Sequence, residues 1–194
     1  MADRVMMIRH GETEWTAKYL HTGRTDIPLN AHGEQRARLL EPILRATPGI
    51  ESATVLTSPL QRARRTCELA GLGDRATVVD DLTEWDYGEF EGTRTADLRV
   101  ADPTWSIWTA PVERGESLAA VGDRADRVVA ILDTIEGMAV LFAHAHILRI
   151  LGARWCGFPP IGGTRLTLDP ASISVLGHER ETRVIESWNR SPHY

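Results

Sequence analysis

The residues of this sequence best suited to chemistry are Arg9 and His10, which follow a short apolar run at residues 5–8 and precede Gly11. The run predicts a buried strand that ends at the glycine. An arginine offers a forked cation to phosphate oxygens, a histidine offers a nucleophilic nitrogen, and a glycine lets an anion approach the backbone. Because α/β proteins build their sites at the carboxyl ends of strands, this group indicates phosphoryl chemistry.

Three further polar residues follow strand-like runs in the same way. They are Arg62 after the run 53–57, Glu84 after 76–79 and His144 after 138–142. The carboxyl ends of parallel strands lie along one edge of a sheet, so these side chains would meet Arg9 and His10 there. Arg62 differs in this respect from its neighbours Arg64 and Arg65, which we expect on a solvated helix face.

Strand and helix patterns alternate along the chain, which predicts a single α/β domain over residues 1–194. Further strands are expected at 164–168, 172–176 and 182–188. Helices are expected at 33–46, with a kink or break at Pro42, and at 59–71, 117–135 and 145–156. Ser58 and Ser117 would cap two of these helices, with Pro59 at a first helical position. Irregular segments are expected at 11–30 and 102–116.

Six segments carry a family pattern when they are taken in order. They are RHGETEW at 9–15, HTGRTDIPL at 21–29, SPLQRA at 58–63, LTEWDYGEFEG at 82–92, GES at 115–117, and His144 after its strand. Together they resemble the histidine phosphatase superfamily, the phosphoglycerate mutase-like proteins. The runs at 21–23 and 84–88 are similar to a subgroup with actinobacterial acid phosphatases and the fungal sedoheptulose bisphosphatase. The resemblance implies a three-layer αβα sandwich with a mostly parallel sheet.

The resemblance also implies roles for the residues at the expected sheet edge. His10 would attack phosphorus in line and become a phosphohistidine, while a backbone carbonyl holds its other ring nitrogen. Arg9, Arg62 and His144 would bind phosphoryl oxygens and stabilise the charge of the transition state. Glu84 would protonate the leaving alcohol and then take a proton from the attacking water.

Substrate-binding residues implied by the resemblance lie in the loop after the first strand, at Thr16, Thr22 and Gly23. Thr16 stands where many relatives have a phosphate-binding asparagine, and its hydroxyl reaches less far. Ala145 replaces the glycine that usually follows the second histidine. Other carboxylates near Glu84 leave open which one donates the proton: Asp80, Asp81, Asp86, Glu89 and Glu91.

Three aromatic residues near the motifs have two interpretations each. His146 enters the site if a helix begins there, and otherwise it points away or packs. Trp105 and Trp108 lie in the irregular segment, where they would either wall a pocket or anchor the segment by packing.

The main interpretation is a phosphoric monoester hydrolase for a small phosphorylated metabolite such as a sugar phosphate. A phosphoglycerate mutase is the first alternative, but true mutases carry a different run where this chain has 85–88. A metallohydrolase would use His144 and His146 as metal ligands, yet no clustered aspartates and histidines complete such a site. A third alternative is an inactive module that binds a phosphorylated ligand. We therefore expect no metal and no cofactor.

The composition limits the classes of binding partner and the cellular compartment that we expect for this protein. A net charge of −5 argues against a general nucleic-acid binder. No apolar run approaches the roughly 20 residues that span a bilayer, and no signal peptide is visible. Cys67 and Cys156 do not form a close metal-type pair, so a reducing cytoplasmic setting is expected, with a disulfide between them left open. The sequence makes no prediction of the oligomeric state.

Overall fold

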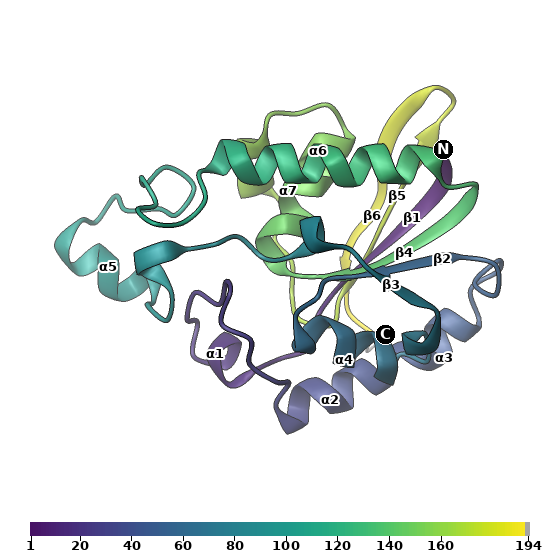
Figure 1. The fold of residues 1–194 in the computed structure, drawn as a ribbon, viewed down its shortest axis with the longest axis horizontal. Helices are drawn as coiled ribbons and strands as arrows, with labels where there is room; N and C mark the ends of the chain where they lie inside the picture. Colours follow the sequence, from purple (N-terminus) through teal and green to yellow (C-terminus); the bar gives the residue numbers. More distant parts are fainter. Residues whose placement is uncertain (193–194) are drawn as a thin grey trace.

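The computed structural model describes residues 1–192, and within them lies one six-stranded sheet of order β3-β2-β4-β1-β5-β6 (Figure 1). Its strands are β1 Ala2–Arg9, β2 Thr54–Thr57, β3 Ala76–Val78, β4 Gly137–Ala143, β5 Ile173–Glu179 and β6 Thr182–Arg190. The first four strands pair in parallel, whereas β5 and β6 run antiparallel to their neighbours. The predicted α/β class with a mostly parallel sheet is confirmed.

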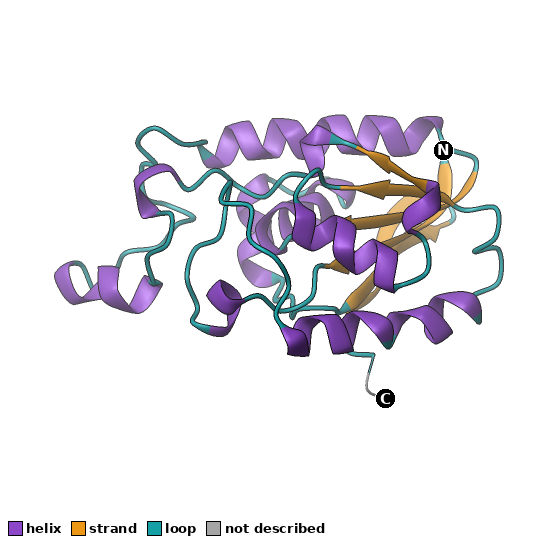
Figure 2. Ribbon diagram, turned by 60° about the horizontal axis from the view of Figure 1, so that its bottom comes forward, coloured by secondary structure: helices purple, strands orange, loops and turns teal. Residues whose placement is uncertain are grey.

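Helices cover both faces of this sheet, as Figure 2 shows. The helices are α1 Glu14–Ala17, α2 Ala31–Arg38, α3 Leu40–Arg45, α4 Gln61–Leu69, α5 Thr95–Ala101, α6 Leu118–Thr134 and α7 Ala145–Trp155. One layer holds α6 and α7, and the opposite layer holds α2, α3 and α4 (Figure 1). The short helices α1 and α5 lie beyond the end of the sheet. The predicted three-layer αβα sandwich is therefore confirmed.

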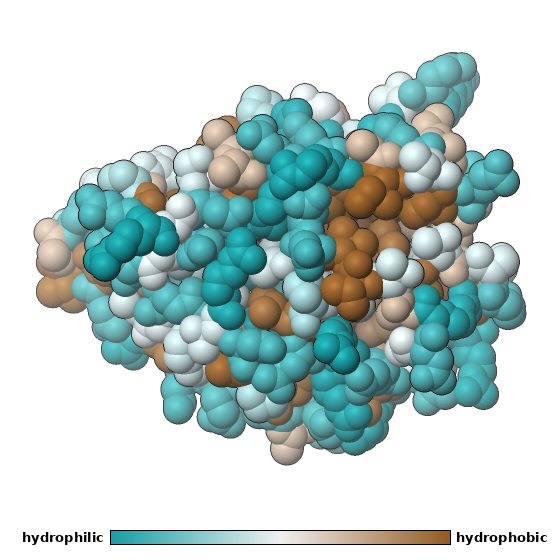
Figure 3. Space-filling view, in the orientation of Figure 1, coloured by the Kyte–Doolittle hydropathy of each residue, from teal (hydrophilic) through white to brown (hydrophobic). Residues whose placement is uncertain are grey.

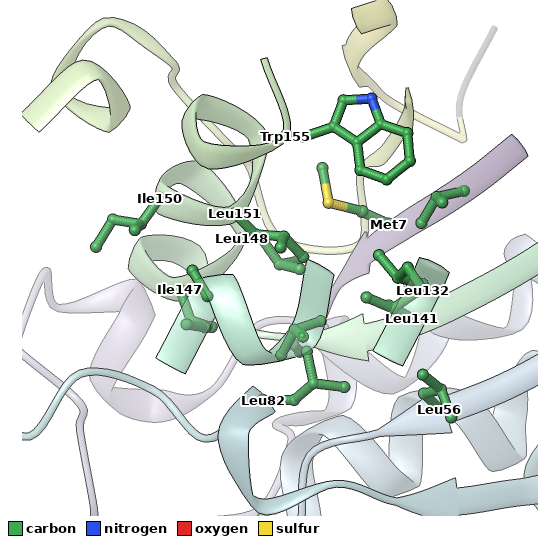
Figure 4. Packing of buried hydrophobic residues seen from close by; sticks show 14 of the residues in the cluster. Met7, Leu56, Leu82, Leu132, Leu141, Ile147, Leu148, Ile150, Leu151 and Trp155 are labelled. Atoms are coloured by element: carbon green, nitrogen blue, oxygen red, sulfur yellow. The ribbon is translucent and has the colours of Figure 1, made fainter. Parts of the chain in front are cut away.

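Strand side chains alternate between two buried hydrophobic clusters, one on each face of the sheet. Met7 and Leu141 belong to the cluster with Leu132 of α6 and Leu151 of α7 (Figure 4). Met6, Ile8, Val140 and Phe142 belong to the other, together with residues of α3 and α4. A sheet buried on both faces explains why its central strands read as nearly continuous apolar runs.

The helix expected at 33–46 is two helices, because the chain breaks at Leu39 rather than at Pro42. The helix expected from Pro59 begins two residues later at Gln61, and its N-cap Leu60 has no capping side chain. The predicted cap at Ser58 is therefore wrong. Ser58 instead extends the hydrogen bonding between β2 and β4, since its backbone N donates to the carbonyl of Phe142 at 2.9 Å.

Two further predictions about the second half of the chain have different outcomes. Ser117 does cap α6, because its hydroxyl accepts a hydrogen bond from the backbone N of Ala120 at 3.1 Å. The strand expected at 164–168 is wrong, since Pro160–Arg165 forms a 3-10 helix and the next residues join no ladder. There the Leu168 carbonyl binds the Arg9 guanidinium instead of a neighbouring strand. Helix α5 was not predicted.

A pair of glycines fixes the loop that leaves β1. A Cβ added to Gly11 would stand 2.5 Å from the carbonyl oxygen of Gly33 in α2. A Cβ added to Gly33 would stand 2.1 Å from the carbonyl oxygen of Glu12. Backbone therefore packs directly on backbone here, and the Asn30 backbone N closes the contact by donating to the Glu12 carbonyl at 2.9 Å.

The remaining surface and sulfur features are ordinary for a small α/β domain. Figure 3 shows hydrophobic side chains gathered between α6 and β3. Val78 of the edge strand β3 is 49% exposed. Cys67 and Cys156 are both free, so the structure contains no disulfide between them. Among the described residues, no helix has the length and apolar character needed to cross a membrane.

Candidate active site

The carboxyl ends of β1, β4 and β2 bring His10, His144 and Ser58 together. Arg9 pairs with Ala143 in the ladder, and Thr57 pairs with Phe142, so the next residue of each strand lies at the same edge. His10 also donates its backbone N–H to the carbonyl of Ala143 at 2.9 Å. The predicted meeting of separate strand ends is thus present.

The imidazole of His10 has a defined tautomer. Its Nδ1 lies 2.6 Å from the carbonyl oxygen of Gly11, which can only accept a hydrogen bond, so Nδ1 donates. Nε2 of the neutral ring therefore carries a free lone pair. Burial, followed by the charges of Arg62 and Arg9, lowers the pKa of His10 well below its usual range. The nucleophilic form of the ring consequently persists into mild acid.

His144 is held just as firmly, 5.0 Å from His10 between ring centroids. Arg62 donates its Nε–H to His144 Nδ1 at 3.1 Å, so the proton of the neutral ring sits on Nε2. That Nε2–H donates to Ser58 Oγ at 2.7 Å. Arg62, His144 and Ser58 are all completely buried. We call Arg9, His10, Ser58, Arg62 and His144 the histidine–arginine cluster.

Within residues 1–192, neither guanidinium of this cluster forms an ion pair with a carboxylate. Arg62 donates to the carbonyls of Thr22, Gly23 and Thr25, and Arg9 donates to a carbonyl of the chain before β5. Within residues 1–192, Arg9 Nε is also a buried donor with no partner at all. Uncompensated buried cations and an unsatisfied N–H together favour the binding of an anion.

Glu84 lies opposite the cluster and is held by backbone donors. Its carboxylate accepts from the backbone N of Trp85 at 3.1 Å, of His146 at 3.1 Å and of Ile147 at 3.0 Å. Two of these donors belong to the first turn of α7, where unpaired N–H groups and the helix dipole stabilise a negative charge. The position of Glu84 is thus fixed by the start of the helix that follows His144.

A buried ion pair supports the segment that carries Glu84. Arg124 of α6 binds Glu116 through two hydrogen bonds of 2.7 and 2.8 Å. The same guanidinium donates to the carbonyls of Asp81 and Thr83, and Glu116 accepts from the backbone N of Asp86 at 3.0 Å. The GES run at 115–117 therefore has a supporting role, which the sequence alone did not reveal.

Tyr87 and His146 complete the surroundings of Glu84. Because α7 begins at Ala145, His146 lies in the site, and its Nδ1 is 2.6 Å from the hydroxyl of Tyr87. The ring of Trp108 is 5.0 Å from His146 between centroids. We call Glu84, Tyr87 and His146 the carboxylate cluster.

A pocket of about 680 Å³ opens between the two clusters. Its lining residues are Arg9, His10, Thr16, Tyr19, Leu20, His21, Thr22, Glu84, Tyr87, Arg94, Thr95, Ala96, Arg99, Ala145 and His146. Arg62, His144 and Gly23 are not among the residues of this lining. Trp105 and Trp108 also lie outside it and pack against His21 and His146, which favours the packing interpretation of these tryptophans.

The predicted substrate-binding residues have internal partners as well. Thr16 Oγ1 accepts from the backbone N of Thr13 at 2.8 Å and donates to the Thr13 carbonyl at 3.1 Å, so it belongs to the capping box of α1. Thr22 Oγ1 donates to the Leu20 carbonyl at 3.0 Å. Gly23 donates its N–H to Glu91 at 2.9 Å, and this contact joins the 21–29 and 82–92 segments.

The two histidines that a metallohydrolase would use as metal ligands are engaged in other contacts. His144 uses both ring nitrogens on Arg62 and Ser58, and His146 uses Nδ1 on Tyr87. In the described part of the chain, no group of three or more histidine, cysteine, aspartate or glutamate side chains is arranged to hold a metal ion.

Comparison with known proteins assigns the family. The model of the histidine phosphatase superfamily (branch 1) matches residues 5–191. The chain belongs to this superfamily. It is 38% identical over 182 residues to an acid phosphatase of Mycobacterium tuberculosis, covering 93% of this chain and 89% of that protein. A solved structure of a functionally characterised open reading frame from the same organism superposes with a TM-score of 0.90 at 34% identity, over 100% of both chains.

Other histidine phosphatase relatives span two kinds of reaction. A sedoheptulose 1,7-bisphosphatase of Saccharomyces cerevisiae is 35% identical over 81% of this chain and 69% of its own length. A probable phosphoglycerate mutase of Serratia proteamaculans is 30% identical over 95% of this chain and 89% of its own. The relatives with the higher identities are phosphatases, and the predicted class of phosphoric monoester hydrolase is confirmed.

Proposed function

We propose that this histidine phosphatase hydrolyses small phosphomonoesters, sugar phosphates among them, through a phosphohistidine on His10. The observation that carries the proposal is the fixed tautomer of His10. Its Nδ1 donates to Gly11, and its free Nε2 belongs to a residue that lines the pocket beside Arg9. A lone pair next to guanidiniums that form no ion pair within residues 1–192 is suited to attack a phosphorus that carries negative oxygens.

In the first step, His10 Nε2 forms a bond to phosphorus while the ester P–O bond breaks. Arg9, Arg62 and His144 stabilise the phosphoryl oxygens, and the Nε2–H of His144 donates a hydrogen bond to a phosphoryl oxygen instead of to Ser58 Oγ. Glu84 gives its proton to the leaving alcohol oxygen. The alcohol departs and His10 carries the phosphoryl group.

In the second step, water attacks the phosphoryl group, the N–P bond breaks and Glu84 takes a proton from the water. Glu84 ends in the protonation state in which it began, so the cycle needs no further proton carrier. Thr16 and Thr22 line the pocket and would bind substrate from its wall, and Gly23 would act by holding Arg62 through its carbonyl.

The substrate class draws support from relatives that are named for acid phosphatase and sugar bisphosphatase activity. A pocket of about 680 Å³ accommodates a small metabolite beyond the phosphoryl group. The two free cysteines support a reducing, cytoplasmic setting.

The direct test is rapid quench with a ³²P-labelled sugar phosphate, followed by peptide mapping of the protein-bound label. We expect acid-labile label on His10 and release of free phosphate. Label on a serine or aspartate would overturn the mechanism, and transfer to an added glycerate acceptor would indicate a mutase. Loss of turnover in chelator would indicate a metal-dependent hydrolase. Binding of phosphate esters without turnover would indicate an inactive module.

A further inference from the structure

The hydrogen-bonded pair Tyr87–His146 has no part in the proposed reaction. Glu84 supplies and recovers the only proton that moves, and the histidine–arginine cluster binds the phosphoryl oxygens. Yet both members of the pair line the pocket, and their contact of 2.6 Å is among the short ones of the site. A polar pair at a pocket wall that leaves one ring nitrogen without a partner among the described residues requires an explanation.

The partners available to Tyr87 and His146 indicate where their hydrogens lie. Tyr87 is 2% exposed, and its hydroxyl has no hydrogen-bond partner other than His146 among residues 1–192. Burial and the charge of Glu84 raise the pKa of Tyr87 well above its usual range, so the hydroxyl keeps its proton. Because Nδ1 of His146 is the only hydrogen-bond partner of this hydroxyl in the described chain, donation to Nδ1 leaves no hydroxyl hydrogen unpaired, and we infer that direction. The proton of the neutral imidazole therefore sits on Nε2.

The position of the ring is fixed by its surroundings. The rings of Trp85, Tyr87 and Trp108 surround it at centroid distances of 5.9, 5.6 and 5.0 Å. Its Nδ1 lies 4.0 Å from Glu84 Oε2, so the ring stands beside the group that protonates the leaving alcohol. A side chain confined by three aromatic rings is preorganised for binding.

The free edge of the ring faces the pocket. Within the described chain, Nε2 of His146 has no hydrogen-bond partner, and it is not one of the completely buried unpaired atoms. The side chain is 15% exposed, and the residue lines the pocket. His146 thus presents one oriented N–H donor next to Glu84.

We propose that His146 is a specificity-determining residue whose Nε2–H donates to an oxygen on the alcohol part of the substrate, near the ester oxygen, with Tyr87 as its positioning residue. This inference rests on the proposed function and deepens it. The substrate class it names is phosphorylated polyols and sugars, which carry a hydroxyl on the carbon next to the ester. Simple alkyl phosphates lack that acceptor.

A matched pair of esters tests the inference: glycerol 1-phosphate, with a neighbouring hydroxyl, and propyl phosphate, without one. In the wild-type enzyme we expect kcat/KM to favour glycerol 1-phosphate by about tenfold, the effect of one hydrogen bond of about 1.4 kcal/mol. The variants His146→Phe and Tyr87→Phe should lose more on glycerol 1-phosphate than on propyl phosphate. His146→Phe should bring the ratio close to one.

The control is His32→Phe, which replaces a histidine that contacts Glu12 outside the pocket and should leave the ratio unchanged. A wild-type ratio near one, or equal losses on both esters in His146→Phe, would overturn the inference. The ¹⁵N chemical shifts of His146 in the wild-type protein give a second readout that does not need a folded variant, and a proton on Nδ1 would also overturn it. Formation of phosphohistidine is measured separately, so a failure here leaves the proposed function standing.

Discussion

His144 and His146 are separated by a single residue, yet the first belongs to the histidine–arginine cluster and the second to the carboxylate cluster. His144 is completely buried and uses both ring nitrogens on Arg62 and Ser58. His146 is confined by aromatic rings and keeps one nitrogen for the pocket. The start of α7 separates them, because His144 is its extended N-cap and His146 lies within the first turn. The transition from β4 to α7 thus places two histidines in two different clusters of the site.

The difference extends to the clusters in which these histidines lie. The histidine–arginine cluster is cationic and mostly buried, and its Arg9 and His10 line the pocket, so it is suited to the phosphoryl group that every substrate shares. The carboxylate cluster holds one carboxyl group that exchanges a proton and two neutral groups, and it faces the open pocket. Changes in the first should therefore affect all esters equally, and changes in the second should depend on the alcohol.

The largest effect is expected from His10→Ala, which removes the nucleophile. Turnover should fall on the order of 10⁴-fold or more for every ester, because no covalent intermediate forms. Steady-state assays on several phosphate esters and a quench assay for protein-bound phosphate measure this. A melting curve like that of the wild type serves as the control for folding. Residual activity that differs from one alcohol to another would contradict the assignment of His10 to the phosphoryl group that all esters share.

Next in size is Arg62→Lys, which keeps the charge but loses the planar fork that binds His144 and three carbonyls. We expect kcat/KM to fall about 10²–10³-fold, equally for alkyl and aryl esters. Arg64→Lys, on the exposed side of the same helix, should stay within about twofold. Comparable losses at the two positions would show that Arg62 does not bind the phosphoryl group.

Glu84→Gln should separate the two clusters most clearly. An alkyl phosphate leaves as a poor alkoxide and needs a proton, whereas p-nitrophenolate leaves without one. The first step, measured by single-turnover kinetics, should slow about 10²–10⁴-fold for a sugar phosphate and far less for p-nitrophenyl phosphate. Asp86→Asn is the matched control in the same segment. Equal losses on both esters would assign the proton to a neighbouring carboxylate.

The smallest effect concerns stability against pH. Burial is the first cause that lowers the pKa of His10, His144 and His146 well below 6.5. The unfolded chain therefore binds more protons than the folded one below about pH 6.5, and the free energy of unfolding should decrease as the pH falls from 7.5 to 5.5. Urea denaturation measures it. His146→Phe should flatten the dependence, and a wild-type value that stays constant would contradict the assigned burial.

The fold was predictable because its strands are buried on both faces and its connections are helical, and both properties leave periodic patterns. The absence of a strand at 164–168 could not be predicted, since the carbonyl of Leu168 binds the guanidinium of Arg9, 159 positions away in the sequence. Leu39 likewise ends α2 without a proline or glycine to signal it. Contacts of this range leave no trace in local spacing.

The site was predictable where a residue type that is typical of catalysis follows a predicted strand, as for His10 and Glu84. Ser58 was interpreted as a helix cap because serine before proline is a common helix start, and its contact with His144 depends on strand register. The pair Arg124–Glu116 was missed for a similar reason, since an arginine within a helical pattern is normally solvated. Supporting residues are defined by their partners, which only the fold supplies.

The close packing of Gly11 on Gly33 has a consequence for how this protein tolerates change. Gly33 lies in α2, outside the pocket lining, and an alanine there would be a routine helix-favouring replacement in most proteins. Here a single added methyl would press on the carbonyl of Glu12 at 2.1 Å and displace the turn that holds the ring of His10. In a deep mutational scan selected for activity, Gly33 should therefore be as intolerant as the nucleophile, although it touches no substrate.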